Sequence, residues 1–282
     1  MIASWLAAQS DQELAAWLAQ GRALGSGAGG GPVLLDVRGV PVFAKRVPLT
    51  DRELAAPFST ANLFDLPVVC QYGIGSPGFS AWRELAANQL VGDSAGFPRL
   101  HHFRVLPGRP PTAPEFADLD AASARLGGSP QIRARFTELA AASHSLVLFF
   151  EHIPFALREW LTPELLPEVE RQLGEIVAAL RSHDLLHLDV HFGNIRSDGS
   201  RVYLVDFGLA TSPKFALDAE EREFARQHEG HDAELVALHL VNYIEKSVSE
   251  PSPAVAEMRE RLGPTAATWN DFYRRLMTQS VQ

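Results

Sequence analysis

Hydrophobic residues recur at different intervals along the chain, and these intervals predict strands first and helices later. In residues 1–20 they recur at helical spacing, which predicts a helical preface that packs as core. Residues 33–37 and 40–45 are apolar runs, rich in β-branched residues, around a glycine-containing turn, and this pattern is typical of a hairpin. Further strands are expected over residues 97–106 and 145–150, separated by a loop and a short helix.

Helical spacing dominates the chain after residue 150. Helices are expected over residues 79–91, 165–182, 218–228 and 232–246, with two short helices at the C-terminal end. Residues 48–80 are dense in Pro, Gly, Ser and Thr, so an ordered, loop-rich insertion is expected there. Strands early and helices late predict an α+β fold of two lobes, an N-terminal lobe over residues 1–150 and a helical C-terminal lobe over residues 151–282.

The composition is that of a globular protein, and it argues against nucleic acid and membranes as partners. Of 282 residues 46% are hydrophobic, enough for one large core or two modest ones. The net charge is -9 and the 25 Lys and Arg are scattered, which argues against nucleic acid as the main partner. Cys70 is the single cysteine, so no intramolecular disulfide forms. With no apolar run of membrane-spanning length and no signal-peptide pattern, we expect a cytoplasmic protein without a membrane partner.

Candidate chemistry concentrates in residues 187–210. Asp189 and Asn194 come before a predicted hairpin, whose expected two-residue turn is Asp198-Gly199, and Asp206 comes after it. Such a hairpin brings Asn194 and Asp206 close together. Hard oxygen donors of this kind suit Mg²⁺, which usually takes one or two protein carboxylates beside substrate phosphates.

The same residues resemble the protein-kinase-like superfamily. The shared pattern is His-x-Asp-x-x-x-x-Asn followed by Asp-Phe-Gly, present here as His187, Asp189, Asn194 and residues 206–208. The resemblance implies a bilobal kinase-like fold, with an antiparallel sheet and a helix in the first lobe and a shortened helical second lobe. It also implies ATP as the phosphate donor and Mg²⁺ as the cofactor, with Asn194 and Asp206 as metal ligands and Asp189 facing the acceptor hydroxyl.

Nucleotide-binding elements are implied upstream. Gly25, Gly27 and Gly30 match a glycine-rich loop whose backbone N–H groups approach phosphate oxygens. Lys45 ends a strand in the sequence Phe-Ala-Lys and matches the lysine that contacts the α- and β-phosphates. Glu84, on the following predicted helix, is the expected ion-pair partner of that lysine.

The connector between the two lobes is implied to bind adenine through its backbone, at Glu151 and Ile153.

Some of these residues also have a purely structural interpretation, which stays open. The glycine tract alone is equally typical of a flexible linker, and His191 of an ordinary loop residue. Asp232 is expected to be the N-cap of its helix, although its position also matches the kinase aspartate that holds the catalytic loop.

The acceptor of the phosphate stays open at this stage. Leu188 stands where protein kinases that are switched by phosphorylation carry Arg, and no Ala-Pro-Glu follows Gly208. His191, two residues after Asp189, is typical of aminoglycoside and choline phosphotransferases. We expect an atypical kinase acting on protein Ser or Thr. The alternatives are a kinase of small hydroxylated compounds and a nucleotide-binding scaffold without catalysis.

Overall fold

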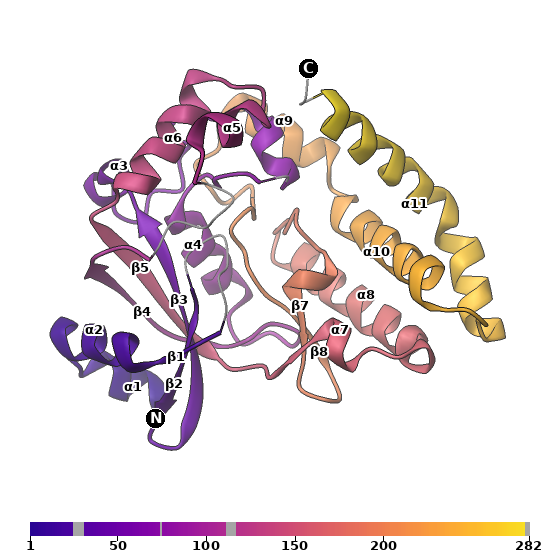
Figure 1. Cartoon of the computed structure of the whole chain (residues 1–282), viewed down its shortest axis with the longest axis horizontal. Helices are drawn as coiled ribbons and strands as arrows, with labels where there is room; N and C mark the ends of the chain where they lie inside the picture. Colours follow the sequence, from indigo (N-terminus) through magenta and orange to yellow (C-terminus); the bar gives the residue numbers. More distant parts are fainter. Residues whose placement is uncertain (25–30, 74, 111–116, 280–282) are drawn as a thin grey trace.

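A twisted antiparallel sheet forms one side of the molecule (Figure 1). The computed structural model describes residues 1–24, 31–73, 75–110 and 117–279. Within these residues the sheet has five strands in the order β1-β2-β3-β5-β4. Their bounds are β1 Arg22–Ala23, β2 Val33–Val37, β3 Val40–Leu49, β4 Leu100–Pro107 and β5 His144–Glu151.

The predicted hairpin is the β2–β3 pair. Val37 pairs with Val40, and the two turn residues Arg38 and Gly39 have φ of 58° and 82°. Positive φ at both central positions is the type I′ geometry that matches the twist of paired strands. The Asp36 carboxylate accepts a hydrogen bond from the Gly39 N–H at 2.6 Å, which fixes the turn further.

The sheet is covered on both faces because side chains alternate along each strand. On β5, Val147 and Phe149 belong to the core under helices α1 (Ile2–Ala7) and α2 (Asp11–Gln20), which are the predicted helical preface. The alternate residues Leu146 and Leu148 belong to the core under α4 (Ala81–Val91). A strand that is buried on both faces has a nearly continuous apolar sequence, and residues 145–150 show this pattern.

The insertion after β3 is more regular than its composition suggests. Strand β3 continues to Leu49, and the Thr50 side chain then begins α3 (Asp51–Ala55) through a capping box with Glu53. The 3₁₀ helix η1 (Val68–Tyr72) follows. Its Cys70 packs with residues of α6 (Pro130–Ala141), which comes after α5 (Leu119–Ala124). The loop-rich expectation missed α3 because that helix is little more than one turn and depends on its cap.

Helices dominate the other side of the molecule, where α8, α10 and α11 lie side by side (Figure 1). Their bounds, with the smaller elements around them, are α7 Leu157–Trp160, η3 Pro163–Leu165, α8 Leu166–Ser182, η4 Phe192–Asn194, α9 Ala219–Gln227, α10 His231–Ser247 and α11 Pro253–Gln279. The described residues also form a three-strand sheet of β6 Phe155–Ala156, β7 Ile195–Ser197 and β8 Val202–Leu204. The α+β prediction with a sheet-rich and a helix-rich lobe is confirmed.

Two local predictions were wrong. The C-terminal region is the long helix α11, which continues through Pro264, where two short helices were expected. Proline normally ends a helix, but Val255, Met258 and Ala266 are buried in the core shared with α10, and this packing outweighs the lost hydrogen bond. The β7–β8 turn has four residues, 198–201, because the Asp198 carboxylate accepts hydrogen bonds from the N–H groups of residues 200 and 201.

Among the described residues, no helix combines the length and the apolar character that crossing a lipid bilayer requires.

Candidate active site

Lys45 lies between two carboxylates at the junction of the sheet and the helical lobe. Its Nζ atom is 2.7 Å from Glu84 Oε1 and 2.7 Å from Asp206 Oδ1. On β3, Phe43 and Val47 pack against the core under α4, and Lys45 lies on the same face by alternation. This alternation brings the Lys45 side chain to Glu84, which is 39 residues away in sequence.

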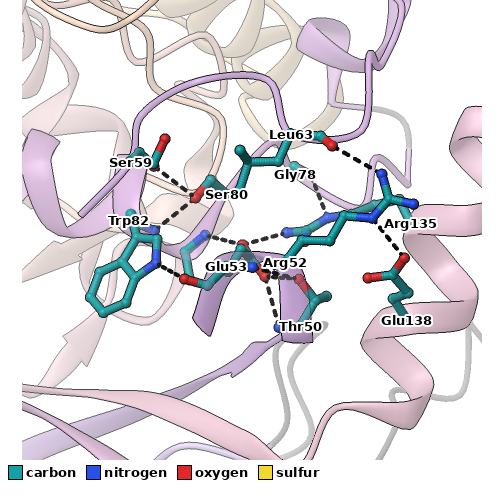
Figure 2. Close-up of polar contacts among 11 residues, drawn as sticks. Thr50, Arg52, Glu53, Ser59, Leu63, Gly78, Ser80, Trp82, Arg135 and Glu138 are labelled. Atoms are coloured by element: carbon teal, nitrogen blue, oxygen red, sulfur yellow. Dashed lines mark hydrogen bonds and ion pairs between the residues drawn. The ribbon is translucent and has the colours of Figure 1, made fainter. Parts of the chain in front are cut away.

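A buried carboxylate fixes the start of the helix that carries Glu84. Figure 2 shows Glu53, which is fully buried and accepts hydrogen bonds from the Ala81 N–H at 2.8 Å and from Arg135 at 3.1 Å. The backbone oxygen of Glu53 accepts from Trp82 Nε1 at 2.8 Å. Burial raises the pKa of Glu53, but the charge of Arg135 and the hydrogen bonds from Arg135, Thr50 and Ala81 together outweigh burial and leave the pKa below its ordinary value. The ionised Glu53 therefore holds the N-terminus of α4 in place.

A second buried ion pair joins α4 to the helical lobe. Arg83, the residue before Glu84, donates from Nη1 to Glu221 Oε1 of α9 at 2.6 Å, and each side chain is 1% exposed. The Arg83 Nε atom also donates to the Thr60 carbonyl at 2.6 Å. Glu221 additionally belongs to the capping box that begins α9 with Asp218. Helix α4 is thus fixed from both lobes.

Asp189 and Asn194 are hydrogen-bonded to each other in the loop before β7. Asn194 Nδ2 donates to Asp189 Oδ2 at 2.9 Å and to the Asp189 carbonyl at 3.0 Å. His191 Nε2 lies 3.6 Å from the same carboxylate oxygen. Burial raises the pKa of Asp189, and the nearby negative charge of Asp206 acts in the same direction. A perturbed carboxylate in a partly exposed position is typical of functional sites.

The hairpin brings Asp206 to this loop, as predicted. The Val205 N–H donates to the Asn194 carbonyl at 2.9 Å, and Ile195 pairs with Leu204. Asp206 has a φ of 70°, which is rare for a residue other than glycine and concentrates at functional sites. Loss of solvent raises the pKa of Asp206, but attraction to Lys45 and the hydrogen bonds from Lys45 and the Gly208 N–H together outweigh this and lower it.

Asp232 holds the loop that precedes Asp189. Its two carboxylate oxygens each accept a backbone hydrogen bond at 2.8 Å, from the N–H groups of His187 and Leu188. Burial raises the pKa of Asp232 to about 6. The N-cap interpretation was wrong, because Gly230 is the N-cap of α10 and Asp232 lies within the first turn. The alternative weighed from the sequence, an aspartate that holds the loop, describes the geometry found.

His187 is a structural hydrogen-bonding residue. Its Nε2 donates to the Val205 carbonyl at 3.1 Å, and its Nδ1 accepts from the Asp189 N–H at 3.3 Å. Burial lowers its pKa to about 4, so the ring is neutral at pH 7. The ring therefore ties the Asp189 loop to the end of β8.

The donor set fits a magnesium ion. Asn194 uses its nitrogen for Asp189, and within the described chain its Oδ1 makes no hydrogen bond. Asp206 uses Oδ1 for Lys45 and the Gly208 N–H, and its Oδ2 has no such bond in the same part of the chain. One carboxylate and one amide oxygen suit Mg²⁺. No group of three or more His, Cys, Asp or Glu in the described part could hold a metal.

The structure says less about the other predicted site residues. Gly25, Gly27 and Gly30 lie outside the described residues. Glu151 ends β5 and Ile153 follows it, between the sheet and the helical lobe. The Ile153 carbonyl accepts from Arg196 Nε at 3.2 Å, which occupies one backbone acceptor of the predicted adenine connector.

Sequence reasoning missed Glu53, Arg83 and Glu221. A capping-box pattern, Thr followed three residues later by Glu, marks Glu53, but its contacts with α4 and α6 are long-range. Arg83 and Glu221 are 138 residues apart, and each is an ordinary charged residue of a helix in the sequence. Their pairing has no local signal.

Comparison with known proteins gives only local similarity. No protein-family model matches the chain. A protein of Methanosarcina acetivorans, named as a probable bifunctional tRNA threonylcarbamoyladenosine biosynthesis protein, is 35% identical over 91 residues, which are 30% of this chain and 15% of that protein. A protein of the same name from Methanosarcina barkeri is 36% identical over 79 residues, 26% of this chain and 14% of that protein. The chain thus spans about one-seventh of the length of these curated relatives.

Proposed function

We propose that the protein is an ATP- and Mg²⁺-dependent phosphotransferase, a kinase that transfers the γ-phosphate to a hydroxyl group. One observation carries the proposal. Lys45 from the sheet, Glu84 from α4 and Asp206 from the helical lobe meet within 2.7 Å at one point. A lysine held in this way between two carboxylates keeps its positive charge, because they raise its pKa against the effect of burial.

Each residue has a role in this proposal. Lys45 binds the α- and β-phosphates of ATP, and Glu84 orients it. Asn194 and Asp206 hold Mg²⁺, which neutralises phosphate charge when bound. Asp189 accepts a hydrogen bond from the acceptor hydroxyl and orients its oxygen toward the γ-phosphate. Phosphoryl transfer depends mainly on such positioning and charge neutralisation.

The acceptor expected from the sequence is protein Ser or Thr, with a small hydroxylated compound as the alternative. The local matches to tRNA threonylcarbamoyladenosine biosynthesis proteins cover at most 30% of this chain and are no basis for assigning their pathway to it. The intact set of Lys45, Asp189, Asn194 and Asp206 favours catalysis over a non-catalytic scaffold.

Incubation with γ-labelled ATP, Mg²⁺ and a cell lysate tests the proposal. The wild-type protein should transfer label, and Asp189→Asn should lose transfer while it still binds ATP. Asp120→Asn, in an aspartate that is 72% exposed on α5, is the matched control and should transfer label normally. Equal transfer by wild type and Asp189→Asn would show that Asp189 does not orient the acceptor. Absence of ATP binding in the wild type would refute the function.

A further inference from the structure

Residues 68–73, here called the η1 wall, end at Gly73, which lies directly against the carboxylate of Asp189. A Cβ atom built on Gly73 would be 3.2 Å from Asp189 Oδ1 and 3.6 Å from Leu209 Cδ1. Gly73 also has a φ of +85°, so glycine suits both the backbone conformation and the close approach. Main chain therefore covers the Oδ1 side of Asp189.

The η1 wall is attached to the helical lobe through Tyr72. The Tyr72 hydroxyl is 2.9 Å from His228 Nε2, at the end of α9. Its ring also packs against Phe224 and Phe272, with centroid distances of 5.3 and 5.0 Å. These contacts place an aromatic side chain of the insertion across the face of the helical lobe.

The η1 wall is attached equally firmly to the sheet-rich lobe. Cys70 is fully buried, in a core with Phe79 and Ile132. Gly78, five residues after the wall, accepts from Arg135 Nε at 3.2 Å, and Figure 2 shows Arg135 held by Glu53. Because packed contacts hold it on both lobes, the η1 wall bounds the site on this side.

Asn194 and His191 lie beside the other oxygen of Asp189. Its Oδ2 atom faces Asn194 Nδ2 at 2.9 Å and His191 Nε2 at 3.6 Å. Tyr273 of α11 lies near enough that the charge of Asp189 adds to burial in raising the Tyr273 pKa. Tyr273 in turn contacts Phe272, the ring that packs on Tyr72. The Asp189 side chain nevertheless stays 31% exposed, so solvent and a small acceptor can reach it.

We infer that the acceptor is a compact hydroxyl-bearing compound and that the η1 wall keeps polypeptide chains away from Asp189. The inference rests on the proposed function and concerns its substrate class. A Ser or Thr hydroxyl in a protein brings main chain on both sides, and each extended residue adds about 3.3 Å. A flanking residue on the Oδ1 side of Asp189 would meet the main chain at Gly73, whereas a small alcohol needs only the exposed part of the carboxylate. This reverses the expectation of a protein acceptor.

The test compares two acceptor pools and two glycine variants. Wild-type protein with γ-labelled ATP and Mg²⁺ is given either an ultrafiltrate of a cell lysate or a degenerate Ser/Thr peptide library. We expect label in compounds of the ultrafiltrate and none in the peptides. Gly73→Ala should lower transfer to the ultrafiltrate at least about tenfold without weakening ATP binding, because residue 73 faces Asp189.

Gly75→Ala is the matched control. Gly75 also has a positive φ, +70°, but a Cβ there would meet no atom of the described residues within 4 Å. The Gly75→Ala variant therefore has comparable backbone strain but no new contact with Asp189. This variant should transfer label like the wild type. Thermal unfolding of both variants shows whether each is folded.

The possible outcomes distinguish a failure of this inference from a failure of the proposed function. If the wild type fails to bind ATP, the proposed function itself is wrong. If it binds ATP but labels the peptides, or labels nothing in the ultrafiltrate, the substrate class is wrong. If folded Gly73→Ala and Gly75→Ala transfer label equally well, the η1 wall does not limit access to Asp189.

Discussion

Removing the charge of Glu221 should destabilise the protein and weaken ATP binding together. Glu221→Gln keeps the size of the side chain but leaves the Arg83 guanidinium, 1% exposed, without its ionic partner. Breaking a buried pair from one side costs about 3–5 kcal/mol. Because glutamine keeps an oxygen acceptor for Arg83, we expect the lower end, about 3 kcal/mol, which is about a hundredfold in the unfolding equilibrium.

The effect on ATP follows from the position of Arg83 beside Glu84. When α4 loses its attachment to α9, Glu84 is held less firmly against Lys45, and the affinity for ATP should fall while kcat at saturating ATP changes less. Urea unfolding gives the stability, and titration with a non-hydrolysable ATP analogue gives the affinity.

Glu223→Gln is the control on the same helix. Glu223 pairs with Arg226 at the surface, where the two side chains are 50% and 66% exposed. Such pairs contribute about 1 kcal/mol or less. If Glu221→Gln and Glu223→Gln agree within about 1 kcal/mol in stability and bind the analogue equally well, the attachment of α4 through Arg83 does not act as described.

Three further changes test the site and the helical core beside it. Lys45→Met should abolish measurable binding of the ATP analogue, and unchanged binding would remove Lys45 from the phosphate site. Asp232→Asn replaces one of the two side-chain oxygens that accept from backbone N–H groups by a hydrogen-bond donor. Turnover should therefore fall at least about tenfold while the affinity for ATP is retained. Normal turnover would contradict the role of Asp232 in holding the loop. Burial lowers the pKa of His231 to about 3, below its unfolded value of about 6.5. The stability from keeping this ring neutral is complete above pH 6.5 and is lost as the pH falls toward 3. Thermal unfolding should therefore show that His231→Phe loses about 2 kcal/mol less than wild type between pH 7 and 5, and equal losses would contradict this.

Local signals predicted the elements that carry the site. The predicted hairpin brings the backbones of Asn194 and Asp206 together, and Lys45 lies on a strand, as the Phe-Ala-Lys motif implied. The β2–β3 turn also followed from nearby residues. What could not be predicted depends on packing. Two short helices were expected at the C-terminal end, but packing in the core shared with α10 carries the single helix α11 through Pro264.

Long-range contacts account for most of what the sequence did not predict. The approach of Gly73 to Asp189 joins an insertion to a loop more than a hundred residues later, and no periodicity reports such a contact. The same holds for Arg83 with Glu221. The Arg83–Glu221 pair forms because a buried charge needs a partner, and the whole fold decides which partner it meets. The roles of Gly25, Gly27 and Gly30 stay predictions.

The central claim is that Asp206 and Asn194 hold Mg²⁺ on an ATP molecule bound by Lys45. Calorimetric titration with a non-hydrolysable ATP analogue, with and without Mg²⁺, tests it most directly in wild type and Asp206→Asn. We predict that Mg²⁺ strengthens binding to the wild type at least about tenfold, or 1.4 kcal/mol, and does not strengthen binding to Asp206→Asn. Equal affinity of the wild type with and without Mg²⁺, or the same Mg²⁺ dependence in both proteins, would contradict the account.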